Sequence, residues 1–240
     1  MKKINLIYSK QRTEIILVIT LITILIPACH KAPQLQIGEI ITFGEYEWRV
    51  LDIQDDKALI ITELVIEYLP YHDEFEGVTW VQSTLRAYLN DDFYYSATFS
   101  DIDRERIIQT RYTNEDNQWF GTSGGNFGND KIFLLSLTEV VKYFGDSKQL
   151  SNRPGFPDDE NVGNWTPAEQ HSYFGVIVDE FDVQRTAIDK DGEAAFWWLR
   201  SPGYSPLAAT YVLGLGCIDM RGGNVDYAGC GVRPALWMRL

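Results

Sequence analysis

The distribution of apolar and polar residues at the start of the chain's main part predicts β-structure. Residues 40–43 and 46–53 are two apolar-rich runs separated by a short turn at Gly44, and together they predict a β-hairpin. A further apolar run at 57–62 follows two aspartates and predicts a third strand. The folded part of the chain is therefore expected to begin with a sheet.

Apolar residues recur at helical spacing in the middle of the chain. In 83–90, three apolar residues fall on one face at i, i+3 and i+4, and Ser83 can cap the first turn. Another helix is expected to begin after Ser100. These two segments predict that helices follow the opening strands.

Two capping boxes predict further helices. Ser136 and Glu139 have the spacing at which each side chain reaches the other's backbone amide, and Gly145 is placed to end that helix. Thr166 and Glu169 repeat the pattern, with a proline at the first helical position. Helices are therefore expected after both Ser136 and Thr166.

Aromatic and β-branched residues dominate the last fifty residues and predict strands. The predicted strands are 196–200, 208–213, 217–221 and 232–237. Gly222 and Gly223 predict a hairpin turn after the third of these strands. Strands at both ends with helices between them predict a single α+β domain over residues 37–240, with its N- and C-terminal strands in one sheet.

Two adjacent tryptophans restrict where the first of these strands can lie. Trp197 and Trp198 point to opposite faces if the segment is a strand. Both can be buried only if that strand is central in its sheet and covered on both faces.

The N-terminal residues 1–28 have the pattern of an export signal. Basic residues precede the apolar run 15–26, which is shorter than the roughly 20 residues of a spanning helix. The segment 25–29, ending in Cys29, resembles a bacterial lipobox, which implies cleavage after Ala28 and lipidation of the Cys29 thiol. We therefore expect a lipoprotein held by its lipid on the extracytoplasmic face of the cell membrane, with residues 29–36 as a tether. An uncleaved anchor and a plain secretory signal are the alternatives.

Composition and charge exclude several classes of protein. The chain is 45% hydrophobic and 23% charged, which excludes a disordered, collagen-like or coiled-coil protein. A formal net charge of −13 argues against a nucleic-acid partner, because phosphate binding needs a basic face. Such acidity suits cationic or neutral ligands, although acidic surfaces also serve solubility alone.

Two cysteines remain in the predicted domain. In an exported protein, Cys217 and Cys230 could form a disulfide, and two buried free thiols are the alternative. The chain has no C-x-x-C or H-x-x-x-H pair, which argues against a zinc site.

Glycine, asparagine and aromatic residues are concentrated in the loop 114–130, which is the strongest candidate for a ligand site. The candidate ligand-binding residues are Asn117, Trp119, Phe120 and Asn126. Aromatic side chains on such a loop suit stacking on a sugar or peptide. Asp116 and Asp130 could supply carboxylates to a calcium ion. The alternatives are that asparagine and glycine simply form turns and that Trp119 fills a minor core.

Two arginines lie among the aromatic C-terminal strands. Arg200 and Arg233 could bind an anion, but we favour buried ion pairs or stacking on aromatic rings within the fold.

Four segments together carry a family resemblance. They are 80–90, 124–136, 197–203 with the motif W-L-R-S-P-G, and 231–237 with the motif G-V-R-P-A-L. The chain resembles a family of uncharacterised bacterial secreted and surface proteins known only as a domain of unknown function. That family is similar to proteins with a C-type-lectin-like fold, a group that includes the formylglycine-generating enzyme.

The resemblance implies a C-type-lectin-like fold with long loops on one side, and it implies no established activity. The formylglycine-generating enzyme needs a closely spaced cysteine pair to hold copper, and Cys217 and Cys230 depart from that pattern. Oxidase chemistry of that kind is therefore not expected.

These observations favour a non-catalytic module that binds a glycan, a peptide or a surface partner. An enzyme of unknown reaction, such as a carboxylate-based hydrolase, and a purely structural envelope protein are the alternatives. An acid–base pair held in one pocket would favour the enzyme, whereas an open loop face with exposed aromatic residues would favour the binding module.

Overall fold

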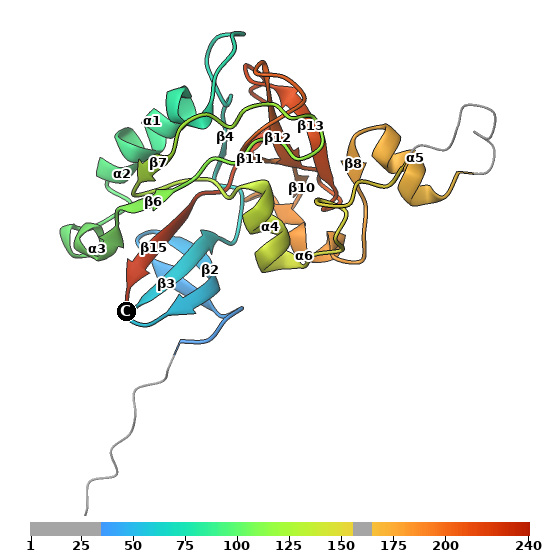
Figure 1. Ribbon diagram of the computed structural model, residues 1–240. Coiled ribbons are helices and arrows are strands. Elements are labelled where there is room, and N and C mark those ends of the chain that lie inside the picture. Colours follow the sequence, from blue (N-terminus) through green and yellow to red (C-terminus); the bar gives the residue numbers. More distant parts are fainter. Residues whose placement is uncertain (1–34, 156–164) are drawn as a thin grey trace, which may run out of the picture. The chain divides into compact units, whose positions relative to one another are not determined.

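The computed structural model describes residues 35–155 and 165–240, and two larger sheets organise them (Figure 1). Residues 35–240 form one compact unit. The predicted signal peptide 1–28 and the lipidation site Cys29 lie outside the described residues.

The first sheet joins the two ends of this unit. Its strand order is β1-β2-β3-β15-β5, with bounds Ile40–Phe43, Tyr46–Gln54, Lys57–Thr62, Ala235–Arg239 and Ile107–Ile108. β15 pairs antiparallel with β3, so that Leu236 lies opposite Ile60. The predicted hairpin and the predicted pairing of N- and C-terminal strands are both confirmed.

The second sheet places the tryptophan-rich strand near its centre. Its order is β4-β14-β11-β12-β13-β8, with bounds Glu67–Tyr68, Gly231–Val232, Trp197–Pro202, Ala208–Val212, Ile218–Asn224 and Val176–Ile177. Trp197 and Trp198 are both fully buried. Trp197 packs against Phe144 on one side, and Trp198 packs against Tyr71 on the other. β11 is therefore covered on both faces, as burial of two adjacent tryptophans requires.

Short helices and two small ladders connect the sheets. The helices are the 3₁₀ turn η1 (Trp80–Gln82), α1 (Thr84–Asn90), α2 (Asp92–Tyr95), α3 (Asp101–Arg106), α4 (Leu137–Phe144), α5 (Pro167–Tyr173) and α6 (Asp182–Arg185). The ladders pair β6 (Thr110–Tyr112) with β7 (Gly128–Asp130) and β9 (Ala187–Ile188) with β10 (Ala194–Ala195). Within the described residues, every helix falls short of the length and apolar character that crossing a membrane requires.

The predicted helix boundaries are confirmed because each depends on a local side-chain contact. Ser136 and Glu139 form the capping box of α4, and Thr166 and Glu169 form that of α5. Ser83 caps α1 by accepting a hydrogen bond from the backbone amide of Arg86.

Two predictions for the last strands are wrong. The sequence predicts that Gly222 and Gly223 form a hairpin turn. In the structure Gly222 lies inside β13, next to an irregularity in the pairing of β13 with β12. It has a φ of 75°, and a Cβ there would lie 2.0 Å from the carbonyl oxygen of Ala209, so the position requires glycine because of close backbone approach. The segment 232–237, predicted as one strand, is split at Pro234 between β14 in the second sheet and β15 in the first.

The disulfide considered from the sequence is not formed. Cys217 and Cys230 are both free thiols, and they directly precede β13 and β14. β11 and β12 lie between those two strands, and the registers place the starts of both strands in one row. Three strand spacings amount to about 14 Å. A disulfide tolerates at most about 7 Å between Cα atoms, so the strand order keeps the thiols apart.

Candidate functional site

Asn117 of the loop 114–130 is used to hold the loop in place. Its side chain is buried, and Nδ2 donates to the carbonyl oxygens of Pro202 at 2.8 Å and Met220 at 2.9 Å. Its Oδ1 accepts from the backbone amides of Trp119 at 3.0 Å and Phe120 at 3.1 Å. The amide group therefore ties the loop to the second sheet and shapes its turn.

The two neighbouring aromatic residues are half-buried and contact the segment 149–153. Nε1 of Trp119 donates to the carbonyl oxygens of residues 149 and 150, each at 3.1 Å. The guanidinium of Arg153 lies 4.8 Å from the ring centre of Trp119 and 5.2 Å from that of Phe120. Asn126 is exposed, and only its backbone oxygen is engaged, by Nδ2 of Asn114 at 2.8 Å. Within the described residues, Asn117 is buried, Trp119 and Phe120 are half-buried, and Asn126 is exposed, so the four predicted ligand residues differ in accessibility.

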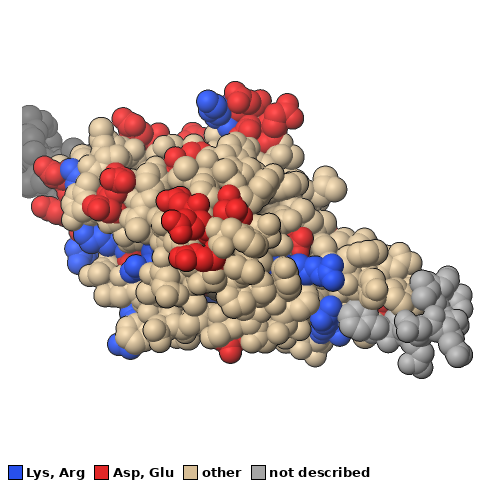
Figure 2. All heavy atoms as spheres, turned by 90° about the horizontal axis from the view of Figure 1, so that it is seen from above, with Lys and Arg blue, Asp and Glu red and all other residues tan. Residues whose placement is uncertain are grey.

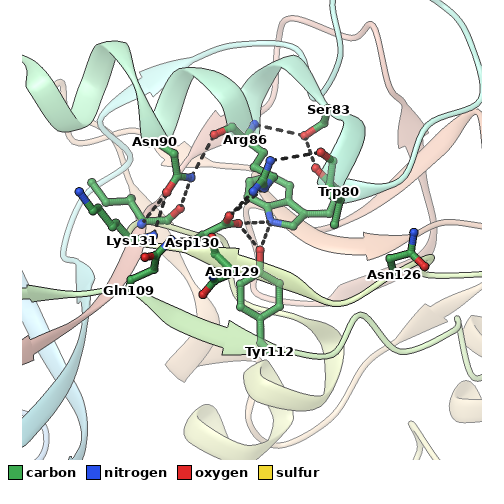
Figure 3. A network of polar contacts seen from close by, with 12 residues as sticks. Trp80, Ser83, Arg86, Asn90, Gln109, Tyr112, Asn126, Asn129, Asp130 and Lys131 are labelled. Carbon is green, nitrogen blue, oxygen red and sulfur yellow. Dashed lines mark hydrogen bonds and ion pairs between the residues drawn. The ribbon is translucent and has the colours of Figure 1, made fainter.

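Asp130, predicted as a calcium ligand, is the centre of a buried polar network (Figure 3). Its Oδ1 accepts from Nε of Arg86 at 2.8 Å and lies 2.6 Å from Nη2 of the same side chain. Its Oδ2 accepts from Nε1 of Trp80 at 3.1 Å and from the hydroxyl of Tyr112. Burial, together with the neighbouring carboxylate, raises the pKa of Tyr112, which keeps its hydroxyl a donor.

Asp116 has a different environment from Asp130. It is exposed, and its Oδ1 accepts from the backbone amide of Gly124 at 2.9 Å. No three His, Cys, Asp or Glu side chains converge as a metal site anywhere in the described part of the chain. The structure thus does not bring the two predicted calcium ligands into one group.

A second polar contact fixes α1 to the segment that follows β7. Oδ1 of Asn90 accepts from the backbone amides of Lys131 at 2.8 Å and Ile132 at 3.2 Å. Its Nδ2 donates to the carbonyl oxygen of Ile132 at 2.7 Å. Because Arg86 and Asn90 are four residues apart, they share one face of α1, and both ends of that face are anchored.

The network continues to α4 through Arg200. The guanidinium of Arg200 lies 4.4 Å from the ring centre of Tyr112 and is ion-paired with Glu139. Arg233 is likewise buried, with its guanidinium 5.1 Å from the ring centre of Trp197. Arg200 is therefore ion-paired and stacked within the fold, as predicted, whereas Arg233 stacks on an aromatic ring and has no ion-pair partner among the described residues.

The remaining face of α1 lines a cavity of about 380 Å³. We call it the acidic cavity, and it is bounded by Glu67, Leu69, Pro70, Asp73, Thr84, Leu85, Ala87, Tyr88, Asp91 and Asp92. Leu85 and Leu89 point from α1 into the core, and Arg86 and Asn90 are held by the network. Thr84, Ala87, Tyr88 and Asp91 are thereby presented to the cavity.

Four carboxylates give the acidic cavity its chemistry. Glu67 comes from β4, Asp73 from the following loop, and Asp91 and Asp92 from the junction of α1 and α2. None of the four has an ion-pair partner among the described residues, and no Lys or Arg lines the cavity. Seen from above, Asp and Glu gather near the middle of the molecular face, with Lys and Arg mostly towards its margins (Figure 2).

Tyr88 and the apolar lining complete the acidic cavity. Burial raises the pKa of Tyr88, and a hydrogen bond with Glu67 adds to the shift, so the phenol remains neutral and polar. An ammonium about 4 Å from one carboxylate gains about 1 kcal/mol in water and up to about 4 kcal/mol near a protein surface. An open cavity with several such carboxylates and an apolar floor is suited to a cationic group carried on an aliphatic stem.

The sequence contains little signal for this cavity. Its carboxylates come from positions 67, 73, 91 and 92, and only the adjacent pair Asp91 and Asp92 stands out in the chain. These residues line one cavity because β4 packs beside α1 (Figure 1). The local sequence around either element does not predict that packing.

Comparison with known proteins gives a family and nothing more specific. No curated protein matches the chain, and no solved structure matches it. A family model described as "Domain of unknown function (DUF6273)" matches residues 55–240, which span the strands and helices that form the network and the acidic cavity. The chain therefore belongs to the DUF6273 family, a domain of unknown function.

Proposed function

We propose that this protein is an extracytoplasmic, lipid-anchored, non-catalytic binding module whose acidic cavity takes the cationic group of a peptide or other surface partner. The observation that carries the proposal is that one cavity is lined by four acidic residues, none of them ion-paired among the described residues, together with apolar residues such as Leu69 and Pro70. The export signal at residues 1–28 and the lipobox-like segment ending in Cys29 support the location.

Rigid placement of α1 supports binding at this cavity. The helix has only seven residues, which is too short to be stable by itself. The ion pair of Arg86 with Asp130 and the hydrogen bonds of Asn90 fix its inner face. A ligand therefore meets a wall whose geometry exists before binding, which lowers the entropic cost of association.

We also propose that the fold is a variant of the C-type-lectin-like type. The pairing of β3 with β15, with helices and long connections between them in sequence, supports this assignment. Superposition of an experimental structure on C-type-lectin-like domains tests it, and a different strand order in the shared sheet would rule it out.

Calorimetric titration with trilysine tests the binding proposal, with triglutamate as the probe of opposite charge. The soluble domain 31–240 should bind trilysine and should not bind triglutamate. The double variant Asp91→Asn/Asp92→Asn should weaken trilysine binding at least about tenfold, because it removes half of the cavity's carboxylates.

The matched control is the double variant Asp56→Asn/Asp226→Asn. Both residues are exposed and neither lines the acidic cavity, yet the change in net charge is the same. Wild-type affinity in the control would confirm local recognition. Equal loss in both double variants would show that only the overall charge attracts the peptide, and the proposal would fail.

A further inference from the structure

A second cavity, of about 370 Å³, is lined by residues of α4 and α6. Its charged lining residues are mainly basic, whereas those of the acidic cavity are all acidic. Arg49 of β2, Glu63, Tyr143 and Phe144 of α4, Gln184 of α6, and Arg233 are among its lining residues. We call it the arginine cavity. Its wall includes aromatic rings from α4, and α4 and α6 lie close together in the fold (Figure 1).

Arg233 is a buried cation that the protein leaves partly unpartnered. It is 2% exposed, and its Nε donates to the carbonyl oxygen of Thr62 at 2.8 Å. Its Nη2 donates to the carbonyl oxygen of Glu63 at 3.3 Å. Its Nη1 is buried without a hydrogen-bond partner, and no carboxylate forms an ion pair with Arg233 within the described residues.

Glu63, the one acidic residue among the described residues that line this cavity, is already engaged. Nε of Arg49 donates to Oε2 of Glu63 at 2.8 Å, and Nη2 of Arg49 pairs with Oε1. The residues that line this cavity therefore carry two guanidinium groups and one carboxylate, which is paired with Arg49, and this leaves a net positive charge beside Arg233. Burial lowers the pKa of Arg233 to about 10, and the second guanidinium adds to that effect, while Glu63 opposes it.

A buried cation without a counter-charge is costly, and a ligand anion can offset that cost. The planar guanidinium suits a carboxylate, since two N–H groups can meet two oxygens, and the aromatic lining favours an organic anion over an inorganic one. Phe144 and Tyr143 provide apolar and aromatic surface for the remainder of the ligand.

We propose that the arginine cavity binds an organic carboxylate with an apolar or aromatic body, with the carboxylate beside Arg233 and Arg49. The site is independent of the acidic cavity, because the two cavities share no lining residue and attract ligands of opposite charge.

The test uses benzoate and its neutral isostere benzamide as probes, with sodium chloride matched for ionic strength. Benzoate should raise the melting temperature of the domain 31–240 saturably, by about 3–6 °C at ten times its Kd. Benzamide should leave the melting temperature unchanged, because it lacks the charge that Arg233 requires.

Arg233 itself is not substituted, because it donates hydrogen bonds to two backbone oxygens and its loss would disturb folding. Two other residues that line the cavity are changed instead. Gln184→Glu places a carboxylate on the wall, and Arg49→Gln releases Glu63 to compensate Arg233. Each should weaken benzoate binding at least tenfold. Gln109→Glu is the matched control, since Gln109 is exposed and does not line the cavity.

The outcomes are decisive in both directions. Benzoate binding that is lost in Gln184→Glu and Arg49→Gln but kept in Gln109→Glu establishes the site. Equal effects of benzoate and benzamide, unchanged affinity in both wall variants, or no stabilisation at 50 mM benzoate would each overturn it.

Discussion

Replacing Asp130 with asparagine should destabilise the domain far more than replacing a surface aspartate. The Asp130 side chain is fully buried, while its partner Arg86 is 26% exposed. The substitution keeps the shape of the side chain but removes the charge that pairs with Arg86. The indole N–H of Trp80 and the hydroxyl of Tyr112, which donate to the Asp130 carboxylate, would then meet a neutral amide group instead.

The expected cost follows from the burial of the pair. Removing one partner of a buried ion pair costs about 3–5 kcal/mol. Because Arg86 can recover part of its hydration, the lower end of that range applies, and we expect a loss of about 3 kcal/mol. For a domain of this size, that corresponds to a fall in melting temperature of about 6–12 °C.

Urea unfolding followed by tryptophan fluorescence measures this loss. The matched control is Asp101→Asn, which breaks the pair of Asp101 with Arg104, in which the aspartate side chain is 93% exposed. Surface pairs contribute about 0–1 kcal/mol, so the control should remain close to wild type. Hydrogen exchange in Asp130→Asn should also accelerate in α1 and β7 before it accelerates in α4.

A loss in the free energy of unfolding below about 1 kcal/mol in Asp130→Asn would contradict the predicted role of the buried ion pair. It would mean that the network does not fix α1, and the acidic cavity would lose its rigid wall.

Further predictions concern the core, the loop 114–130, the thiols and the anchor. Trp198→Ala should cost about 3–5 kcal/mol in urea unfolding, because the side chain is fully buried; a cost under about 1 kcal/mol would contradict its core position. Trp119→Ala should cost about 2 kcal/mol, since the ring is half-buried and its one N–H is shared between two carbonyl oxygens. A thermal melt identical to wild type would show an exposed platform instead. Cys217 and Cys230 should both resist alkylation in the native state at pH 8 and both react after unfolding without reductant. Burial raises the pKa of both thiols, that of Cys217 to about 11, so native labelling of Cys217 should increase as the pH rises towards 11. Cys29→Ser should abolish partition into detergent, and mass spectrometry that shows an unmodified Cys29 in the wild-type protein would contradict lipidation.

Features that depend on neighbours in the sequence could be predicted. The capping boxes of Ser136 with Glu139 and of Thr166 with Glu169 fixed the starts of α4 and α5, because each residue bonds to a backbone amide three positions away. The adjacent tryptophans of β11 could be tied to a central strand for a similar reason, since alternation is a local property of strands.

Features that depend on strand order could not be predicted. Gly222 reads as a turn residue, but its role is to admit the backbone of Ala209 in the paired strand β12. Cys217 and Cys230 are close in sequence, yet two strands lie between the strands that they precede. Pro234 interrupts what reads as one strand and directs its two halves into different sheets.

The candidate site was missed for the same reason. Asn117 and Asp130 attract attention as polar residues on a glycine-rich loop, but folding buries both and uses their hydrogen-bonding groups internally. The acidic cavity is assembled from residues on β4, the loop after it and the junction of α1 and α2. Their proximity exists only after the network has placed α1.

Chemical-shift mapping of trilysine on the ¹⁵N-labelled domain 31–240 shows directly whether the acidic cavity binds a cationic peptide. We expect saturable shifts concentrated in residues 67–73 and 84–92, which contain the acidic residues of the cavity. Shifts centred on the loop 114–130, or spread evenly over the acidic surface, would contradict binding at that cavity.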